Sequence, residues 1–493
     1  MSLFPMHKGQ AHARLVQAGA ALVATAMVAG CGAGYRPVVT PINPSGPAAQ
    51  PSSLAVVVSV PSPTSPGIAT IIDYSGDTVV ASAPIGPGPT TFAVDQTGST
   101  GYTVNSDGTL TNFPVSSSLQ SKNVTYTTLP TTSRLTSLYA PSAGLWAADL
   151  NGNVADVLTG SPETFKLSIP VSPTPIEIIG PGLIAQRNYA ITQGSVSSAV
   201  ACNTSPGTGP VGEADSIEVA NNTVSARIPL GRCPVYALQS NDQRRLYVLN
   251  RGDDTITVIN SQNNTLNACT PFVNQHGRTV TCHPSLPLST TAGLTGAGVP
   301  AIAGPVYAEF NAATSQLVVA SYDGSVVSVI DVSLDEFGDD SATFGTTFTI
   351  PVGNNPASVT ALYDGSRAYT ANQTDGTVSI VNLVSHTLEK SLPVNGHPRT
   401  VVSTQNSLFG KVYVASPDSP YLTILRTDQD IVDATILVQG NILDVRVTTQ
   451  NGSSGNPNNV SRKPGYGQPC YLPPSLLSNS TINATPSACS TLP

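Results

Sequence analysis

One hairpin-like segment recurs with the same plan along most of the chain. Residues 245–260, RLYVLNRGDDTITVIN, align without a gap with residues 367–382, RAYTANQTDGTVSIVN. Each copy has two short runs of Val, Ile, Thr and Tyr separated by a turn sequence, which is the pattern of an antiparallel hairpin. Related segments lie at 101–113, 317–330 and 411–426. Repetition on this scale predicts an all-β fold built from copies of one unit.

The spacing of the copies indicates the kind of unit. The segments that follow the hairpins end in Gly353, Gly396 and Gly440, which are 43 and 44 residues apart. This is the length of a four-stranded β-propeller blade, with strands A to D from the centre outward. Seven complete units are predicted at 87–130, 131–172, 173–231, 232–303, 304–353, 354–396 and 397–440.

The remaining strands predict an eighth blade. Three apolar runs at 54–60, 67–73 and 78–86 lack an inner strand, and residues 441–450 supply one. Pairing N-terminal strands with a C-terminal strand closes the ring and removes its open sheet edges. We therefore predict an eight-bladed propeller over residues 54–450. Seven blades are the alternative, because the units at 131–172 and 173–231 are degenerate.

The hairpin sequences resemble a known family of repeats. Tyr247-Val248-Leu249-Asn250 before TITVIN, and Tyr369-Thr370-Ala371-Asn372 before TVSIVN, are similar to the YVTN family of β-propellers. The resemblance extends over most of 54–450 and weakens at 145–158. It implies the propeller fold but no single function, since the family includes surface-layer proteins, lipoproteins and enzyme-associated proteins.

The N-terminus has the order of a signal peptide. Lys8 and Arg14 precede an apolar run at 15–30 that is too short and too rich in Ala and Gly to span a bilayer comfortably. The run ends in Val-Ala-Gly-Cys, which resembles the bacterial lipobox, in which Cys31 is lipidated. The alternative is an ordinary cleaved signal with an incidental cysteine.

Export to the cell envelope follows from this interpretation. Gly32 stands where an aspartate would indicate retention in the inner membrane, so the outer membrane is favoured, with either side of it open. The predicted domains are a signal peptide at 1–30, a Pro-rich spacer at 31–53, the propeller, and a Pro/Ser/Asn-rich tail at 451–493. The tail is expected to contain a disulfide loop.

Charge and cysteine content agree with an exported protein. Only 10% of residues are charged, and removing residues 1–30 changes the net charge from −8 to −10. This balance excludes a basic nucleic-acid interface. An even number of cysteines after Cys31 predicts disulfides. Sequence order suggests three neighbouring pairs among Cys202, Cys233, Cys269, Cys282, Cys470 and Cys489.

Two long insertions point to a binding face. Residues 192–215 enlarge a B–C loop, and residues 274–303 are interpreted as the following D–A loop, which would put both on the same face. Cys202 and Cys233 would meet there, and Cys269 and Cys282 would brace the longer insertion. A decoration without function is the alternative. The candidate binding residues on this face are Arg251, Asp253, His276, Arg278, His283, His397 and Arg399.

The triplet Arg251-Gly252-Asp253 resembles a cell-adhesion ligand, but the repeat explains it differently. In the alignment Asp253 falls on Asp375 and Asp254 on Gly376. An Asp-Gly-like pair is what a hairpin turn with positive φ requires. Asp253 is therefore predicted to be a turn residue, and Arg251 remains a candidate contact.

No metal or cofactor is predicted. An acidic C–D loop holds Asp331, Asp335, Glu336, Asp339 and Asp340, but their spacing does not fit a calcium loop, so a solvated acidic loop is favoured over calcium. Two histidines and two cysteines around 269–283 fall short of a zinc set once the cysteines are oxidised.

The sequence favours a binding protein over an enzyme. None of the hydrolase, metalloprotease or phosphate-loop motifs is present, and the predicted inner strands are mostly apolar or hydroxyl-bearing. We expect a monomeric, lipid-anchored binding or scaffolding module with a protein or glycan partner. The alternative is an enzyme, lactonase-like or cofactor-dependent, that uses the central channel.

Overall fold

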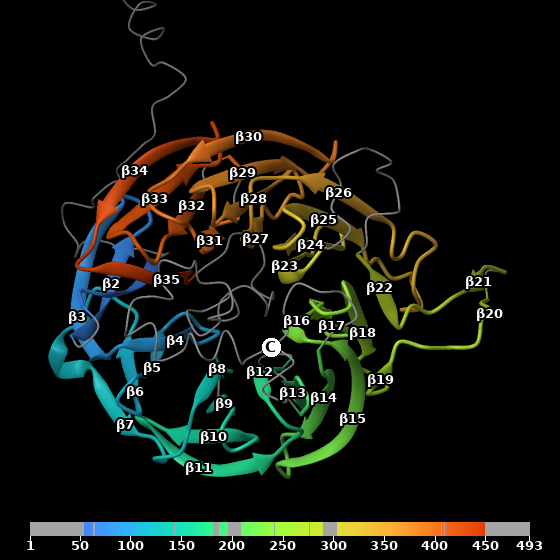
Figure 1. Ribbon diagram of the computed structural model, residues 1–493, viewed down its shortest axis with the longest axis horizontal. Coiled ribbons are helices and arrows are strands. Elements are labelled where there is room, and N and C mark those ends of the chain that lie inside the picture. Colours follow the sequence, from blue (N-terminus) through green and yellow to red (C-terminus); the bar gives the residue numbers. More distant parts are fainter. Residues whose placement is uncertain are drawn as a thin grey trace, which may run out of the picture. The chain divides into compact units, whose positions relative to one another are not determined.

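The protein is an eight-bladed β-propeller, as the repeats predict (Figure 1). The computed structural model describes residues 54–62, 65–141, 144–180, 187–195, 209–240, 242–275, 277–288, 303–405, 407–408 and 410–448. In this part of the chain the sheets are antiparallel, and the single helical segment is the 3-10 turn η1 (Ser121–Asn123). No helix among these residues has the length and apolar character that a bilayer span needs.

The strands of the first four blades are, innermost first: blade 1, β35 (Asn441–Val447), β1 (Leu54–Val60), β2 (Pro66–Asp73) and β3 (Thr78–Pro87); blade 2, β4 (Pro89–Val94), β5 (Thr100–Asn105), β6 (Thr109–Pro114) and β7 (Thr125–Thr128); blade 3, β8 (Leu135–Tyr139), β9 (Leu145–Asp149), β10 (Val154–Gly160) and β11 (Glu163–Pro170); blade 4, β12 (Pro175–Ile179), β13 (Arg187–Thr192), β14 (Val211–Glu218) and β15 (Thr223–Arg232).

The strands of the other four are: blade 5, β16 (Pro234–Gln239), β17 (Arg245–Asn250), β18 (Thr255–Asn260) and, sharing the outer position, β19 (Thr265–Leu266) and β22 (Ser285–Pro287); blade 6, β23 (Pro305–Asn311), β24 (Gln316–Ser321), β25 (Val326–Asp331) and β26 (Thr347–Pro351); blade 7, β27 (Pro356–Ala361), β28 (Arg367–Asn372), β29 (Thr377–Asn382) and β30 (Thr387–Pro393); blade 8, β31 (Thr400–Ser403), β32 (Lys411–Ala415), β33 (Tyr421–Arg426) and β34 (Ile431–Leu437). A separate hairpin, β20 (Phe272–Val273) with β21 (Thr279–Val280), belongs to no blade.

The chain ends close the ring in the predicted manner. β35 pairs antiparallel with β1, with Val57 opposite Val445, so the last described strand becomes the innermost strand of the first blade. β35 also packs against β31 of blade 8 and β4 of blade 2. No blade is therefore left with an open neighbour, which protects the sheet edges from pairing with other chains.

The inner strands are buried on both faces because each blade lies between two others. All six residues of β16 and all six of β17 are buried. Ile179 and Tyr189 of blade 4 share one apolar cluster with Ala237 and Val248 of blade 5. This explains why these segments read as nearly continuous apolar runs rather than as strict alternation.

The repeated asparagine helps to connect its own blade to the preceding one. Asn250 ends β17, and its Nδ2 donates to Thr255 Oγ1 at 3.1 Å and Thr257 Oγ1 at 2.8 Å. Thr257 Oγ1 in turn accepts from the backbone N–H of Gly231, at 3.3 Å, where the chain crosses from blade 4. A Cβ on Gly231 would lie 2.7 Å from Asn250, so only glycine fits. The same arrangement is formed by Asn105 with Thr109, Thr111 and Gly86, and by Asn372 with Thr377, Ser379 and Gly353.

The repeated tyrosine and the basic residue two positions before it form contacts with the following blade. Tyr369 Oη donates to Asp430 Oδ1 in the C–D turn of blade 8, and Arg367 pairs with the same carboxylate. Burial, together with the hydrogen bond to Asp430, raises the pKa of Tyr369. Lys411 Nζ lies 2.5 Å from Asp77 Oδ1 and so joins blade 8 to blade 1 across the closure. Equivalent contacts to the next blade are Tyr102 with Glu163, Tyr189 with Asn264, and Arg245 with Asp340.

Candidate functional site

The Arg-Gly-Asp triplet forms contacts between blades. Arg251 is 8% exposed, and its Nε and Nη2 donate to the two carboxylate oxygens of Asp323 in blade 6, at 2.8 and 2.7 Å. Asp253 Oδ2 accepts from the backbone N–H of Arg232 at 2.6 Å, and Asp254 has φ of +52°. Asp253 is thus a turn residue, as predicted, and the burial of Arg251 leaves little of it for an outside partner to contact.

His397 and Arg399 lie in different surroundings, although they are two positions apart in the sequence. The ring of His397 lies in the D–A connection before blade 8, where Nδ1 is 2.5 Å from Asp418 Oδ2 and the side chain is half exposed. Arg399 is 1% exposed and close enough to Asp444 of blade 1 for its charge to lower the pKa of that carboxyl, although burial raises that pKa overall. Only Arg399 therefore belongs to the buried interior of the ring.

The second insertion lies elsewhere than predicted. We define residues 267–284 as the arm. β22 follows the arm and pairs with β18, Leu286 opposite Ile256, so the arm interrupts the outer strand of blade 5. The interpretation of 274–303 as a D–A loop is therefore wrong for residues 274–287. The signal for the correct position is the alternation of Leu286 and Leu288, both 2% exposed, which complete the outer strand.

A disulfide closes the arm at its base. Cys269 and Cys282 are bonded, as predicted, and the β20–β21 hairpin lies between them. Figure 1 shows this hairpin projecting from the rim of the ring. Cys233 is also disulfide-bonded.

Some predicted residues cannot be compared with the structure. Cys31, Cys202, Cys470, Cys489 and His276 lie outside the described residues.

A buried carboxylate fixes the arm to blade 6. Asp340 is 1% exposed and accepts from Arg245 Nη2 at 3.3 Å, from Asn267 Nδ2 at 2.8 Å, and from the backbone N–H of His283 at 3.0 Å. His283 Nδ1 lies 2.9 Å from the same carboxylate. Because Arg245, Asn267 and His283 come from blade 5 or the arm, Asp340 locks three segments together.

A second ion pair lies further out on the arm. Arg278 Nη2 is 2.6 Å from Asp335 Oδ2, and Asn274 also reaches that carboxylate. Arg278 and His283 were expected on the face opposite the acidic loop, so their contact with Asp335 and Asp340 corrects that placement. The physical reason is that the arm leaves blade 5 through its outer strand, beside the C–D loop of blade 6.

The acidic loop does not assemble a metal set. Within the described residues no three histidine, cysteine, aspartate or glutamate side chains lie close enough together to hold a metal ion. Asp335 Oδ1 accepts from the N–H groups of Phe337 and Asp339, and Asp331 Oδ1 accepts from Ser333. The contact with Arg278 and these turn contacts engage Asp335 and Asp331, two of the four possible calcium ligands.

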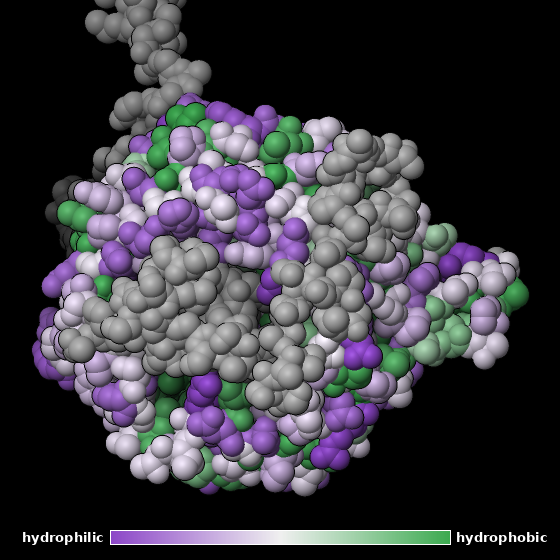
Figure 2. Space-filling view, viewed as in Figure 1, coloured by the Kyte–Doolittle hydropathy of each residue, from purple (hydrophilic) through white to green (hydrophobic). Residues whose placement is uncertain are grey.

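The arm exposes apolar side chains. Phe272 is 42% exposed and Val273 is 66% exposed, whereas Val280 on the partner strand is buried. Figure 2 shows the arm as a projection on which apolar and polar residues lie side by side. An apolar surface on a projecting, disulfide-closed segment is typical of an interaction site.

The axis of the ring holds ionisable residues that the sequence prediction missed. Glu309 of β23 is 3% exposed and accepts from Ala361 N at 2.9 Å and from Gln405 Nε2 at 3.1 Å, thereby linking blades 6, 7 and 8. Glu177 of β12 accepts from Ala237 N of blade 5 at 2.7 Å. The inner strands were expected to be mostly apolar or hydroxyl-bearing, and these positions, with Asp444 and Arg446 of β35, are exceptions. Their neighbours in sequence are apolar, so only position on an innermost strand distinguishes them.

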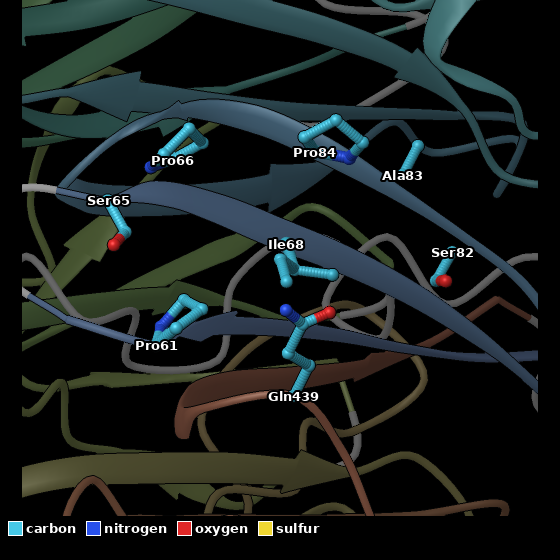
Figure 3. A pocket seen from close by; sticks show the side chains of 8 residues that line it. All are labelled: Pro61, Ser65, Pro66, Ile68, Ser82, Ala83, Pro84 and Gln439. Atoms are coloured by element: carbon cyan, nitrogen blue, oxygen red, sulfur yellow. The ribbon is translucent and has the colours of Figure 1, made fainter.

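A shallow pocket lies on the outer side of blade 1 (Figure 3). Its volume is about 400 Å³, and Pro61, Pro66, Pro84, Ile68, Ala83, Ser65, Ser82 and Gln439 line it. In Figure 3, Gln439 points toward Ile68 from the connection between blade 8 and blade 1. The lining contains no ionisable side chain, so the pocket offers contacts and hydrogen bonds but no acid–base chemistry.

Comparison with known proteins supports the fold. No family model and no curated protein sequence matches the chain, so membership of the YVTN family stays a prediction. Among solved structures, apo AztD from Citrobacter koseri has a TM-score of 0.54 at 11% identity, covering 81% of this chain and 99% of AztD.

Two further structures are comparably similar. Dihydro-heme d1 dehydrogenase NirN has a TM-score of 0.51 at 14% identity, covering 80% of this chain and 74% of NirN. Sqt1 from Saccharomyces cerevisiae has a TM-score of 0.51 at 9% identity, covering 77% and 95%. At such identities the likeness shows the propeller fold alone.

Proposed function

We propose that this protein is an exported, lipid-anchored binding propeller that docks a protein partner of the cell envelope on its arm. The observation that carries the proposal is the exposure of Phe272 and Val273 on a hairpin closed by the Cys269–Cys282 disulfide. A protein is favoured over a glycan because the exposed side chains are apolar and lie on the short strands of a two-stranded hairpin.

The base of the arm supports the same conclusion. Asp340 and Asp335 hold the arm against blade 6 through His283 and Arg278, and Asp340 also pairs with Arg245 of blade 5. A clamped arm loses little conformational entropy when a partner binds it, which favours affinity. The ring then serves as a rigid support.

Crosslinking in cells tests the docking role. A Phe272→Ser/Val273→Ser double variant should lose the partners that crosslink to the wild-type protein, because both exposed apolar side chains are removed. Val384→Ser is the matched control, since Val384 is 76% exposed but lies in the β29–β30 turn of blade 7. An unchanged set of partners in the double variant would contradict the proposal.

Metabolic labelling with a fatty-acid analogue tests the anchor. The wild-type protein should incorporate the label, and Cys31→Ala should not. Labelling of the Cys31→Ala variant would exclude Cys31 as the anchor, while loss of labelling together with release of the protein from the membrane fraction would support it.

An enzymatic or small-ligand role at the axis is the second candidate. The observation that favours it is the presence of Glu177, Glu309, Asp444, Arg399 and Arg446 on the inner side of the ring. Similarity to dihydro-heme d1 dehydrogenase does not carry its ligand to this chain, because the shared property is the fold.

A further inference from the structure

Arg446 occupies an unusual position at the centre of the ring. It lies on β35, the innermost strand of blade 1, and is 1% exposed. Its Nη2 lies 2.8 Å from Asp444 Oδ2 and 3.2 Å from the backbone oxygen of Phe92 on β4, the innermost strand of blade 2. The guanidinium carbon lies 5.7 Å from the centre of the Phe92 ring.

Side chains from the opposite side of the ring lie close to this guanidinium. Burial raises the pKa of the Tyr307 hydroxyl on β23, and the charge of Arg446 acts on that pKa in the opposite direction. Tyr307 packs against Tyr236 with ring centres 4.6 Å apart. Blades 1, 2, 5 and 6 therefore contribute side chains or backbone to one region around the axis.

Most of the donors of Arg446 have no acceptor. Its hydrogen bond to the backbone oxygen of Phe92 and its ion pair with Asp444 both use Nη2, and neither Nε nor Nη1 has a hydrogen-bond partner. These atoms carry three N–H bonds between them. A buried charged donor without an acceptor is costly, and folded proteins almost always supply an acceptor for such groups.

The nearby residues do not provide that acceptor. Asp444 is fully buried and already faces Arg446 through Nη2, while the charge of Arg399 also acts on it. Two guanidinium groups thus act on one carboxylate, while the charge of Glu309 acts on Tyr307 nearby.

We propose that the Nε and Nη1 atoms of Arg446 bind the oxyanion group of a small ligand, a carboxylate or a phosphate, at the axis of the propeller. An oxyanion fits because the unused atoms are all donors and carry positive charge. A small ligand is the class proposed because Arg446 is 1% exposed and lies on the innermost strand of blade 1, beside that of blade 2. This site is independent of the arm and of the docking role proposed above.

Titration calorimetry on the purified propeller tests the proposal. Acetate and inorganic phosphate are the probes, titrated at constant ionic strength with chloride as the balancing anion. We expect saturable binding of at least one probe. Arg446→Lys should weaken binding by about tenfold or more, because it keeps the charge but loses hydrogen bonds to the ion. The control Arg227→Met, at an exposed arginine of β15, should leave the affinity unchanged.

A second measurement keeps the test decisive if Arg446→Lys does not fold. In crystals of the wild-type protein soaked in selenate, anomalous scattering should locate the anion within hydrogen-bond distance of Arg446 Nε or Nη1. No saturable binding, an anion found only elsewhere, or an Arg446→Lys variant with wild-type affinity would each overturn the proposal. In those cases water alone would satisfy the guanidinium.

Discussion

The axis of the ring and the arm use polar and apolar residues in opposite ways. At the axis, charged side chains such as Glu309 are buried and bonded to neighbouring blades, with 3% of Glu309 exposed. On the arm, polar contacts lie at the base, and the apolar Phe272 is 42% exposed. The comparison teaches that buried polar groups fix the geometry of this propeller. The residues available to a partner are instead those, such as Phe272, whose side chains stay exposed after the blades have packed.

The largest effect is expected where the arm joins the ring. Asp340→Ala should destabilise the protein by about 3–5 kcal/mol, because it leaves the buried guanidinium of Arg245 without its carboxylate. Urea unfolding measures the loss, and limited proteolysis should cut the arm sooner. Asp335→Ala removes the more exposed pair with Arg278 and should cost less than about 1 kcal/mol. Equal effects of the two variants would remove the distinction between a buried clamp and a surface contact.

The next effect concerns the axis. Glu309→Ala should cost about 2–3 kcal/mol, since the Ala361 N–H and the Gln405 amide lose a buried acceptor. Glu309→Gln keeps one carbonyl acceptor and should cost less. Thermal unfolding compares the two variants, and proteolysis of the arm should stay unchanged in both. Faster cleavage of the arm in Glu309→Ala would show that axis and arm are coupled.

A buried carboxylate in blade 3 allows the effect of burying a charged group to be tested through the pH dependence of stability. Burial raises the pKa of Asp156 to about 6, while a hydrogen bond from Ser168 acts in the opposite direction. The pKa of Asp156 is thus higher in the folded protein than in the unfolded chain, where it is about 4. The contribution of Asp156 to stability is therefore complete below about pH 4 and is lost as the pH rises through about 6. The loss at neutral pH should be about 2–3 kcal/mol.

Asp156→Asn should remove this dependence. The variant should unfold at a higher temperature than the wild type at pH 8, and the difference should shrink toward pH 4. Differential scanning calorimetry across this range measures it. A constant difference between the two proteins at every pH would show that Asp156 does not titrate in this window.

The smallest effect on stability is expected at the tip of the arm. Phe272→Ser/Val273→Ser should change the free energy of unfolding by less than about 0.5 kcal/mol per site, because both side chains are exposed. Chemical unfolding measures this beside the crosslinking experiment. A loss of several kcal/mol would mean that the two residues support the fold and would weaken their assignment to partner binding.

The prediction from sequence succeeded where the contacts are local or repeated. The hairpins around Asn250 and Asn372 recur with fixed spacing, because each asparagine needs hydroxyls five and seven residues later. That regularity allowed eight blades to be counted and the β1–β35 closure to be predicted. The turn role of Asp253 followed in the same way, from alignment with Asp375.

The prediction failed where one position differs from its repeats. Glu177 and Glu309 stand among apolar residues, and nothing local indicates that blades 5, 7 and 8 supply their partners. The arm was assigned to the wrong loop because two residues, Thr265 and Leu266, complete only the first part of the outer strand. The second part resumes at Ser285, beyond the disulfide.

The sequence by itself therefore indicated the fold class and the blade length, because these depend on hydrophobic pattern and on contacts within about 45 residues. The unpaired strands at the two ends of the repeats predicted the closure, and the tertiary structure decided between seven blades and eight. Only the tertiary structure decided which charges meet. Arg446 reaches Phe92 across 354 residues of sequence, and Asp340 reaches Arg245 across 95. Closure of the ring brings such residues together in space. A contact that occurs only once leaves no repeating pattern in the sequence from which it could be predicted.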